Sequence, residues 1–175
     1  MTLATPIDID LLTFIRTGRF DCIKLGQTKE WIINNFPDPD ELYKNNYKSP
    51  IWLYGNIEFH FYDDQTLFLI YSDYIDTLNG GQSLRLNKWI FDEPQKLTLE
   101  NVTRHLTKER IAYKLEYGTL SNGFTTAAIE VAASQVKLSF GLPESDEEEY
   151  DDYLRRLKNA DSNEFLLFSF SLTKK

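Results

Sequence analysis

Residues 51–74 of this chain of 175 residues read IWLYGNIEFHFYDDQTLFLIYSDY, and they are the most informative part of the sequence about its fold. It contains three runs rich in aromatic and branched side chains, which favour β-strands, separated by two short polar turns. The pair Gly55-Asn56 suits a two-residue hairpin turn, and Asp64-Gln65 suits a second one. The stretch therefore predicts three consecutive antiparallel strands.

These two turns set the strand register and hence the face on which each side chain lies. They place Trp52 opposite Phe59, and Phe59 opposite Ile70. One face then collects large apolar side chains and is the predicted core face: Trp52, Tyr54, Ile57, Phe59, Phe61, Phe68 and Ile70. The other face, called the mixed face below, combines apolar, aromatic and acidic residues: Ile51, Leu53, Glu58, His60, Tyr62, Leu67, Leu69, Tyr71 and Asp73. Such a mixture predicts a face that is partly covered.

The composition narrows the class of protein. Twelve Phe and ten Tyr residues against one Met favour aromatic-rich sheet faces and an α+β fold. The formal net charge of −8 argues against nucleic acid or an anionic membrane as a partner, because phosphate binding needs clustered Lys and Arg. A basic protein partner is compatible with this charge, and the oligomeric state is left open.

The chain has one cysteine, Cys22, which cannot form an internal disulfide. We expect it to be a small buried residue and not a nucleophile. No Cys or His spacing is typical of a zinc site, so no metal and no cofactor are expected. The N-terminal residues lack the pattern of a signal peptide, and no segment reaches the roughly 20 apolar residues of a membrane span. These features predict a cytoplasmic protein.

Helical spacing ahead of residue 51 predicts two N-terminal helices packed on the core face. The first begins after Pro6, ends at Gly18 and carries the apolar residues Ile7, Leu11, Phe14 and Ile15. Thr28 is a good N-cap for the second helix. The second helix is expected to stop at Pro37 and to turn three side chains inward: Trp31, Ile32 and Phe36.

A group of motifs in residues 10–75 resembles known small domains. The motifs are Leu25-Gly26-x-Thr28, then Ile32, Phe36, Pro39-Asp40 and Trp52-x-Tyr54-Gly55. This pattern resembles the αα-βββ domains of the SmpA/OmlA lipoprotein group and the similarly built β-lactamase inhibitor proteins. It is also similar to small domains among the toxin-immunity proteins of bacteria. The resemblance implies a scaffold that binds another protein, in the inhibitor case through the exposed sheet face, and it implies no chemistry.

The remainder of the chain predicts another helix and more strands. Residues 84–91 are expected to add a fourth strand to the first sheet, and Thr98 to cap a helix with a stripe of Leu99, Val102 and Leu106. Alternating residues in 111–117 and 129–140 predict strands, with a turn at Ser121-Asn122-Gly123. The run FLLFSFSL, residues 165–172, is expected to be a central strand, or at least a fully covered one. Four of its apolar residues fall on one side: Leu166, Phe168, Phe170 and Leu172.

These elements predict an α+β fold in which two N-terminal helices pack on an antiparallel sheet, followed by a second helix-plus-antiparallel-strand unit. We expect a single domain over residues 1–175. The order of elements leaves open whether residues 1–92 and 93–175 are two related subunits of the fold.

The closest approach to an acid/base site is Glu58-x-His60, which puts a carboxylate and an imidazole on one strand face near Tyr62 and Tyr71. No partner nucleophile or phosphate-binding loop accompanies the pair, so we predict no catalytic residue. His105 is expected to lie on an exposed helix face. Asp63 and Asp64 are explained by turn formation, because they lack the ligand spacing of a calcium loop.

Residues 144–152 hold seven acidic side chains in nine, which either engage a basic protein or form a solvated helix start. The leading hypothesis is a non-enzymatic protein-binding domain of the inhibitor or immunity kind. Its partner-binding residues are predicted to be Glu58, His60, Tyr62, Leu69, Tyr71, Asp73, Glu147, Glu148 and Glu149. The alternative is a small-molecule-binding or hydrolytic domain with Glu58, His60 and Tyr62 lining a pocket. A third hypothesis is a structural accessory domain.

Overall fold

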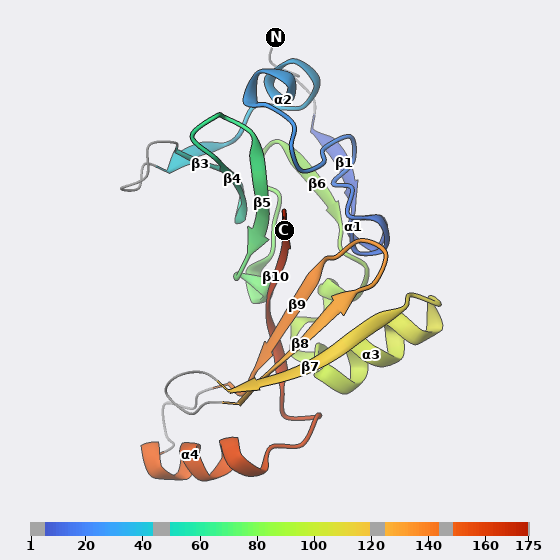
Figure 1. The fold of residues 1–175 in the computed structure, drawn as a ribbon, viewed down its shortest axis with the longest axis vertical. Helices are drawn as coiled ribbons and strands as arrows, with labels where there is room; N and C mark the ends of the chain where they lie inside the picture. The colour runs from blue at the N-terminus through green and yellow to red at the C-terminus, as the bar shows by residue number, and fades with distance from the viewer. Residues whose placement is uncertain (1–5, 44–49, 120–124, 144–148, 175) are drawn as a thin grey trace.

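The fold is described from a computed structural model, which covers residues 6–43, 50–119, 125–143 and 149–174 (Figure 1). One twisted sheet of eight strands runs through the molecule in the order β2-β3-β4-β5-β10-β9-β8-β7, and every neighbouring pair is antiparallel. Its strands are β2 Glu41–Tyr43, β3 Ile51–Tyr54, β4 Ile57–Phe61, β5 Leu67–Ser72, β7 Tyr113–Thr119, β8 Thr125–Val131, β9 Lys137–Gly141 and β10 Leu166–Thr173. The α+β class is therefore confirmed.

The remaining elements are a small second sheet and short helices. Strands β1 Ile7–Asp10 and β6 Leu84–Asn87 form a parallel pair. The described α-helices are α1 Leu11–Thr17, α2 Lys29–Asn35, α3 Leu99–Lys108 and α4 Tyr150–Asn159. Three 3-10 turns lie between β5 and α3: η1 Ile75–Thr77, η2 Trp89–Asp92 and η3 Pro94–Lys96.

The first hairpin has the predicted register. Trp52 pairs with Phe59, Leu53 with Glu58, and Tyr54 with Ile57 around the Gly55-Asn56 turn. Beyond the second turn, Phe59 pairs with Ile70 and His60 with Leu69, as expected. The predicted first turn, and the face predicted for each side chain, therefore agree with the structure over most of the three strands.

The second turn differs from the prediction. The loop has three residues instead of two, because the Tyr62 amide donates to the Thr66 carbonyl and Gln65 takes a left-handed backbone conformation. A bulge then restores the expected register, since Phe61 pairs with Leu67 while His60 pairs with Leu69. The assignment of Phe68 to the core and Leu67 to the mixed face was therefore wrong. Leu67 is fully buried and Phe68 is half-buried.

The predicted first helix begins four residues too early. The Asp10 carboxylate accepts the amides of Leu12 and Thr13, so the helix starts at Leu11, and Gly18 ends it as expected. Residues 7–10 form β1 instead, and β1 pairs with β6. Residues 84–87 are thus a strand, but the prediction that they join the first sheet was wrong.

The second helix is capped by Thr28, whose hydroxyl accepts the Trp31 amide. Ile32 and Phe36 are buried as expected. Trp31 is 38% exposed, so its predicted inward position was wrong. With only seven residues the helix buries a narrow stripe, and Trp31 falls outside it.

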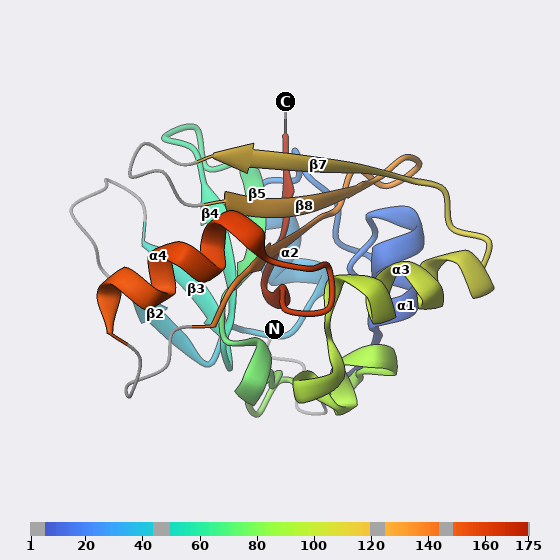
Figure 2. The same ribbon diagram turned by 90° about the horizontal axis from the view of Figure 1, so that it is seen from below.

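The predicted packing of two N-terminal helices on one antiparallel sheet is not matched, whereas a helix followed by antiparallel strands is present as α3 and β7–β9. Helix α2 lies at one end of the sheet, whereas α1 lies beside β6, and α3 packs behind β7 and β8 (Figures 1 and 2). Strand β10 joins the two halves, because it pairs with β5 on one side and with β9 on the other. The expected central position of residues 165–172 is confirmed.

The core is a chain of edge-to-face aromatic contacts that runs through both halves. Phe59 contacts Phe20 at 5.6 Å between ring centroids, Phe20 contacts Phe14 at 5.4 Å, and Phe14 contacts Phe170 of β10 at 5.7 Å. Phe168 was expected on the same side as Phe170. A bulge between Leu167 and Ser169 leaves Phe168 46% exposed and buries Leu167 instead.

Candidate functional site

The mixed face is the candidate site, and the structure places its predicted partner-binding residues on β4, on β5 and directly after each of these strands. Glu58, His60, Leu69 and Tyr71 are half-buried, while Tyr62 and Asp73 are exposed. Phe68 takes the place predicted for Leu67. The opposite face of these strands is the core, to which α1, α2 and α3 contribute their buried side chains.

Glu58 and His60 form a pair at 2.7 Å between Oε2 and Nε2. They stand two residues apart on β4, so both side chains project from the same face. About a fifth of each side chain is exposed. The carboxylate holds the imidazole in a fixed orientation, which suits recognition by hydrogen bonding as well as proton transfer.

Tyr71 anchors a second polar group beside this pair. Its phenol is hydrogen-bonded to the Asp73 carboxylate and to the Ser169 hydroxyl of β10. Burial, together with the Asp73 charge, raises the pKa of the Tyr71 phenol to about 12. Tyr71 therefore stays neutral and acts as a hydrogen-bonding group that ties β5 to β10.

An aromatic cluster forms the more exposed part of the mixed face. The rings of Tyr62 and Phe68 stack with 4.4 Å between centroids, and His60 meets Phe68 edge-on at 6.1 Å. Tyr62 is 43% exposed. Tyr43 of β2, paired with Ile51 on the same face, is 54% exposed.

Sequence reasoning missed Tyr43 and Phe68 as members of this face. Residues 37–50 have no clear period, and β2 has only three residues, so its strand pattern was too short to find. Phe68 was assigned to the wrong face because of the bulge. The left-handed residue of this three-residue loop is Gln65 and not a glycine or asparagine, so the sequence carried no clear signal of the bulge.

The same sheet face continues into the second half of the chain. A row of paired residues crosses from Glu58 through Tyr71, Ser171 and Lys137 to Glu130 and Lys114. Charged and small side chains replace the aromatic ones along this row. The apolar part of the face is thus confined to β2–β5.

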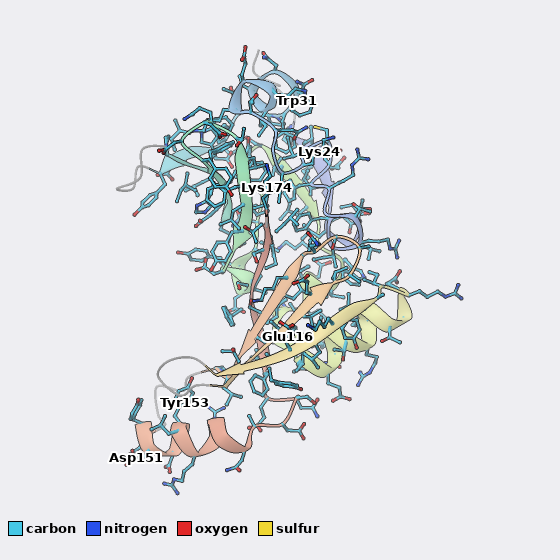
Figure 3. The ribbon with its side chains drawn as sticks, viewed as in Figure 1. Lys24, Trp31, Glu116, Asp151, Tyr153 and Lys174 are labelled. Atoms are coloured by element: carbon cyan, nitrogen blue, oxygen red, sulfur yellow. The ribbon has the colours of Figure 1, made fainter. Side chains whose placement is uncertain are left out.

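The acidic run is not brought to the mixed face. Glu147 and Glu148, like the predicted turn at residues 121–123, lie outside the described residues. Glu149 is exposed at the start of α4, followed by the exposed Asp151 and Asp152. Helix α4 lies at the end of the molecule opposite α2, as the labels of Asp151 and Trp31 show (Figure 3).

The hypothesis of a small-molecule-binding or hydrolytic domain requires a pocket beside His60. The two hollows that can be located among the described residues lie in other parts of the surface. One, of about 500 Å³, lies between η2 and α3, beside Trp89 and His105. The other, of about 600 Å³, lies near Arg19, Lys24 and Trp31. Neither is lined by Glu58, His60 or Tyr62.

Cys22 is exposed at this second hollow, so its predicted burial was wrong. Partial burial of the sulfur, and then Asp21 beside it, raise the pKa of the thiol to about 11. A raised pKa keeps the thiol protonated at neutral pH, and the thiolate is the reactive form.

We therefore expect Cys22 to be alkylated by iodoacetamide at pH 8 at least roughly tenfold more slowly than in the unfolded chain, because the fold raises the pKa of the thiol to about 11. The rate should rise as the pH approaches 11. Mass spectrometry of timed samples, with the same protein in urea as control, measures this. Equal rates in the folded and unfolded chain would contradict the protonated thiol.

Within the described residues, no group of three or more His, Cys, Asp or Glu side chains is placed to hold a metal ion. His105 is exposed on α3, as expected, and its ring lies 6.2 Å from that of Trp89. The Asp64 carboxylate accepts the amide and hydroxyl of Thr66, which confirms its role in the turn. Among the described helices, none has the length and apolar character needed to cross a membrane.

The resemblance to the SmpA/OmlA group, to β-lactamase inhibitor proteins and to immunity proteins stays a prediction. Its motif residues serve the fold: Thr28 caps α2, Trp52 and Tyr54 lie in the core, and Gly55 closes the first hairpin. A comparison of the chain with protein-family models, curated proteins and solved structures finds no match.

Proposed function

We propose that this protein is a non-enzymatic protein-binding domain, of the inhibitor or immunity kind, that uses the mixed face. The observation that carries the proposal is the exposed stack of Tyr62 on Phe68, set beside the Glu58–His60 pair. Exposed aromatic rings surrounded by polar groups are typical of protein interfaces. Tyrosine in particular supplies a large contact area with few rotatable bonds.

The charges of this region favour a basic partner. The acidic residues Glu41, Glu58 and Asp73 lie on one side of the aromatic cluster, and Asp63 and Asp64 lie in the turn on its other side, where Asp64 also interacts with Lys174. The mixed-face residues defined above, on β3–β5 and in the positions next to these strands, include no Lys or Arg, whereas Lys137 and Lys114 lie further along the same sheet face. A partner with an apolar centre and a rim of Lys or Arg would complement this surface and associate faster for it.

The alternative of a small-molecule-binding or hydrolytic domain is supported by the Glu58–His60 pair alone. Such a site needs a concave pocket around the pair and a third group to act on the substrate. The two hollows described above are lined by other residues. The protein-binding proposal is supported in addition by the exposed Tyr62–Phe68 stack.

Tyr62→Ala is expected to weaken partner binding by about 2 kcal/mol, roughly 30-fold in Kd, because the variant loses the outer ring of the stack. The melting temperature should change little, since Tyr62 is exposed. The matched control is Tyr150→Ala, which removes another exposed tyrosine at the start of α4. Tyr71→Ala is less suitable, because Tyr71 also ties β5 to β10.

The parent, Tyr62→Ala and Tyr150→Ala serve as three parallel baits in extracts of the native host. A protein retained by the parent and by Tyr150→Ala but lost with Tyr62→Ala is then purified and titrated by calorimetry. The proposal fails if binding partners are retained equally by all three baits. It fails also if Tyr62→Ala unfolds the protein, because the patch would then be part of the core.

A further inference from the structure

Strand β7 is a long exposed edge of the eight-stranded sheet. It pairs with β8 on one side over seven residues. Residues 114–118 are all exposed, including the side chains of Leu115 and Tyr117. Strand β2 at the other edge has only three residues. An uncovered edge of the length of β7 presents a row of backbone donors and acceptors that another strand can pair with.

The backbone groups at this edge belong to the odd-numbered residues. The Ala112 carbonyl accepts the Ala132 amide at 2.9 Å, so even-numbered residues direct their backbone groups towards β8. By the same alternation, Tyr113, Leu115 and Tyr117 direct their N–H and C=O groups away from β8. These three residues are therefore the ones available to a further antiparallel strand.

The side chains of β7 are complementary to those of a second, antiparallel β7. Lys114 and Glu116 lie on one face, 2.5 Å apart between Nζ and Oε1. When Leu115 is placed opposite Leu115 of a second copy, Lys114 of each chain faces Glu116 of the other. In the same register Tyr113 faces Tyr117 in both directions. Opposite charges and aromatic pairs across neighbouring strands stabilise a sheet.

The neighbouring registers lack this complementarity. If one strand is moved by two residues in one direction, Lys114 lies opposite Lys114 of the second copy. If it is moved by two residues in the other direction, Glu116 lies opposite Glu116. A shift by a single residue would turn the odd side chains against the even ones. One register therefore combines the free backbone groups with opposite charges.

We propose that two copies of this chain associate through antiparallel pairing of their β7 strands, with Leu115 on the two-fold axis. The two sheets then become one continuous sheet, and each edge protects the other from pairing with unrelated chains. Each chain carries a net charge of −8, which opposes association, so the pairing depends on the opposite charges that the register brings together. This surface is separate from the mixed face, and either proposal can fail without the other.

Charge reversal tests the register. Glu116→Lys and Lys114→Glu each place like charges opposite one another, so each variant should dimerise at least roughly tenfold more weakly than the parent. The double variant Lys114→Glu/Glu116→Lys should recover most of the affinity. A mixture of the two single variants should form the heterodimer. Sedimentation velocity over a range of concentrations measures all four, and thermal unfolding verifies that each variant is folded.

Two further variants test the edge itself. Leu115→Pro removes an N–H that points away from β8, a position where an edge strand tolerates proline, and should leave a folded monomer. Leu115→Cys in a Cys22→Ser background should form a disulfide-linked dimer on mild oxidation, whereas Tyr117→Cys in the same background should not. A parent that stays monomeric at all concentrations would overturn the proposal. The proposal would also be overturned if Leu115→Pro dimerises as strongly as the parent, or if Tyr117→Cys forms the disulfide-linked dimer as readily as Leu115→Cys.

Discussion

Replacing Phe59 with alanine is expected to lower the free energy of unfolding by about 3 to 5 kcal/mol. Phe59 is fully buried at the centre of β4. Its ring lies 4.9 Å from that of Tyr54, 5.6 Å from Phe20 and 6.2 Å from Phe36 between centroids. The substitution removes the shared neighbour of all three rings, and the close-packed surroundings cannot collapse to fill the space.

Urea unfolding followed by tryptophan fluorescence measures this loss, since Trp52 lies opposite Phe59 on β3. The matched control is Phe168→Ala, which removes the same side chain from an exposed position and should cost less than about 1 kcal/mol. If Phe59→Ala is as stable as Phe168→Ala, the assignment of Phe59 to the core is wrong.

The position of Phe59 could be predicted from sequence because it depends on local information. A two-residue turn at Gly55-Asn56 leaves one register for β3 and β4, and the alternation of side chains then sorts them between the two faces. Most of the mixed face follows from the same reasoning, including the contact between Glu58 and His60.

The bulges could not be predicted in the same way. Phe68 and Phe168 are both large apolar residues in alternating runs, yet each lies at a bulge and leaves the core. A bulge inserts one residue and changes the face of those near it, while the composition of the strand stays the same. Hydrophobic alternation alone cannot reveal it.

The order in which the strands pair could not be predicted either, for a different reason. Strand β1 pairs with β6, which lies more than seventy residues further along the chain, and β10 inserts between β5 and β9. Pairing between such distant segments leaves no local pattern, since each strand looks the same whichever neighbour it has. The row from Glu58 to Lys114 depends on these pairings, so the continuation of the sheet face into the second half of the chain could not be predicted.

The Gly55 turn that fixes the register is also where a small change should have a large effect. Gly55 has a φ of +59°, a left-handed conformation in which side chains with a Cβ are strained. The Gly55 amide donates to the Asp40 carboxylate at 2.8 Å, and the same carboxylate accepts the Gln82 amide at 3.0 Å. Asp40 thus holds the first hairpin against the loop that precedes β6.

Gly55→Ala is expected to destabilise the protein by at least about 3 kcal/mol, because backbone strain and steric overlap act together. A Cβ at Gly55 would lie 2.4 Å from the Gly81 nitrogen and 2.6 Å from the Asn79 carbonyl oxygen, both of them backbone atoms. The loop would have to move away and release the Asp40 contacts. Urea and thermal unfolding measure the change.

Gly118→Ala is the matched control, since a Cβ at Gly118 would lie at an ordinary distance of 3.5 Å from the Thr126 hydroxyl. It should stay within about 0.5 kcal/mol of the parent. If the two variants unfold at the same urea concentration, the close approach of Gly55 to residues 79–81 is not required by the fold. The contacts of Gly55 would then not be what fixes the register of β3 and β4. That register places Trp52 opposite Phe59 in the core and puts Glu58 and His60 on the mixed face.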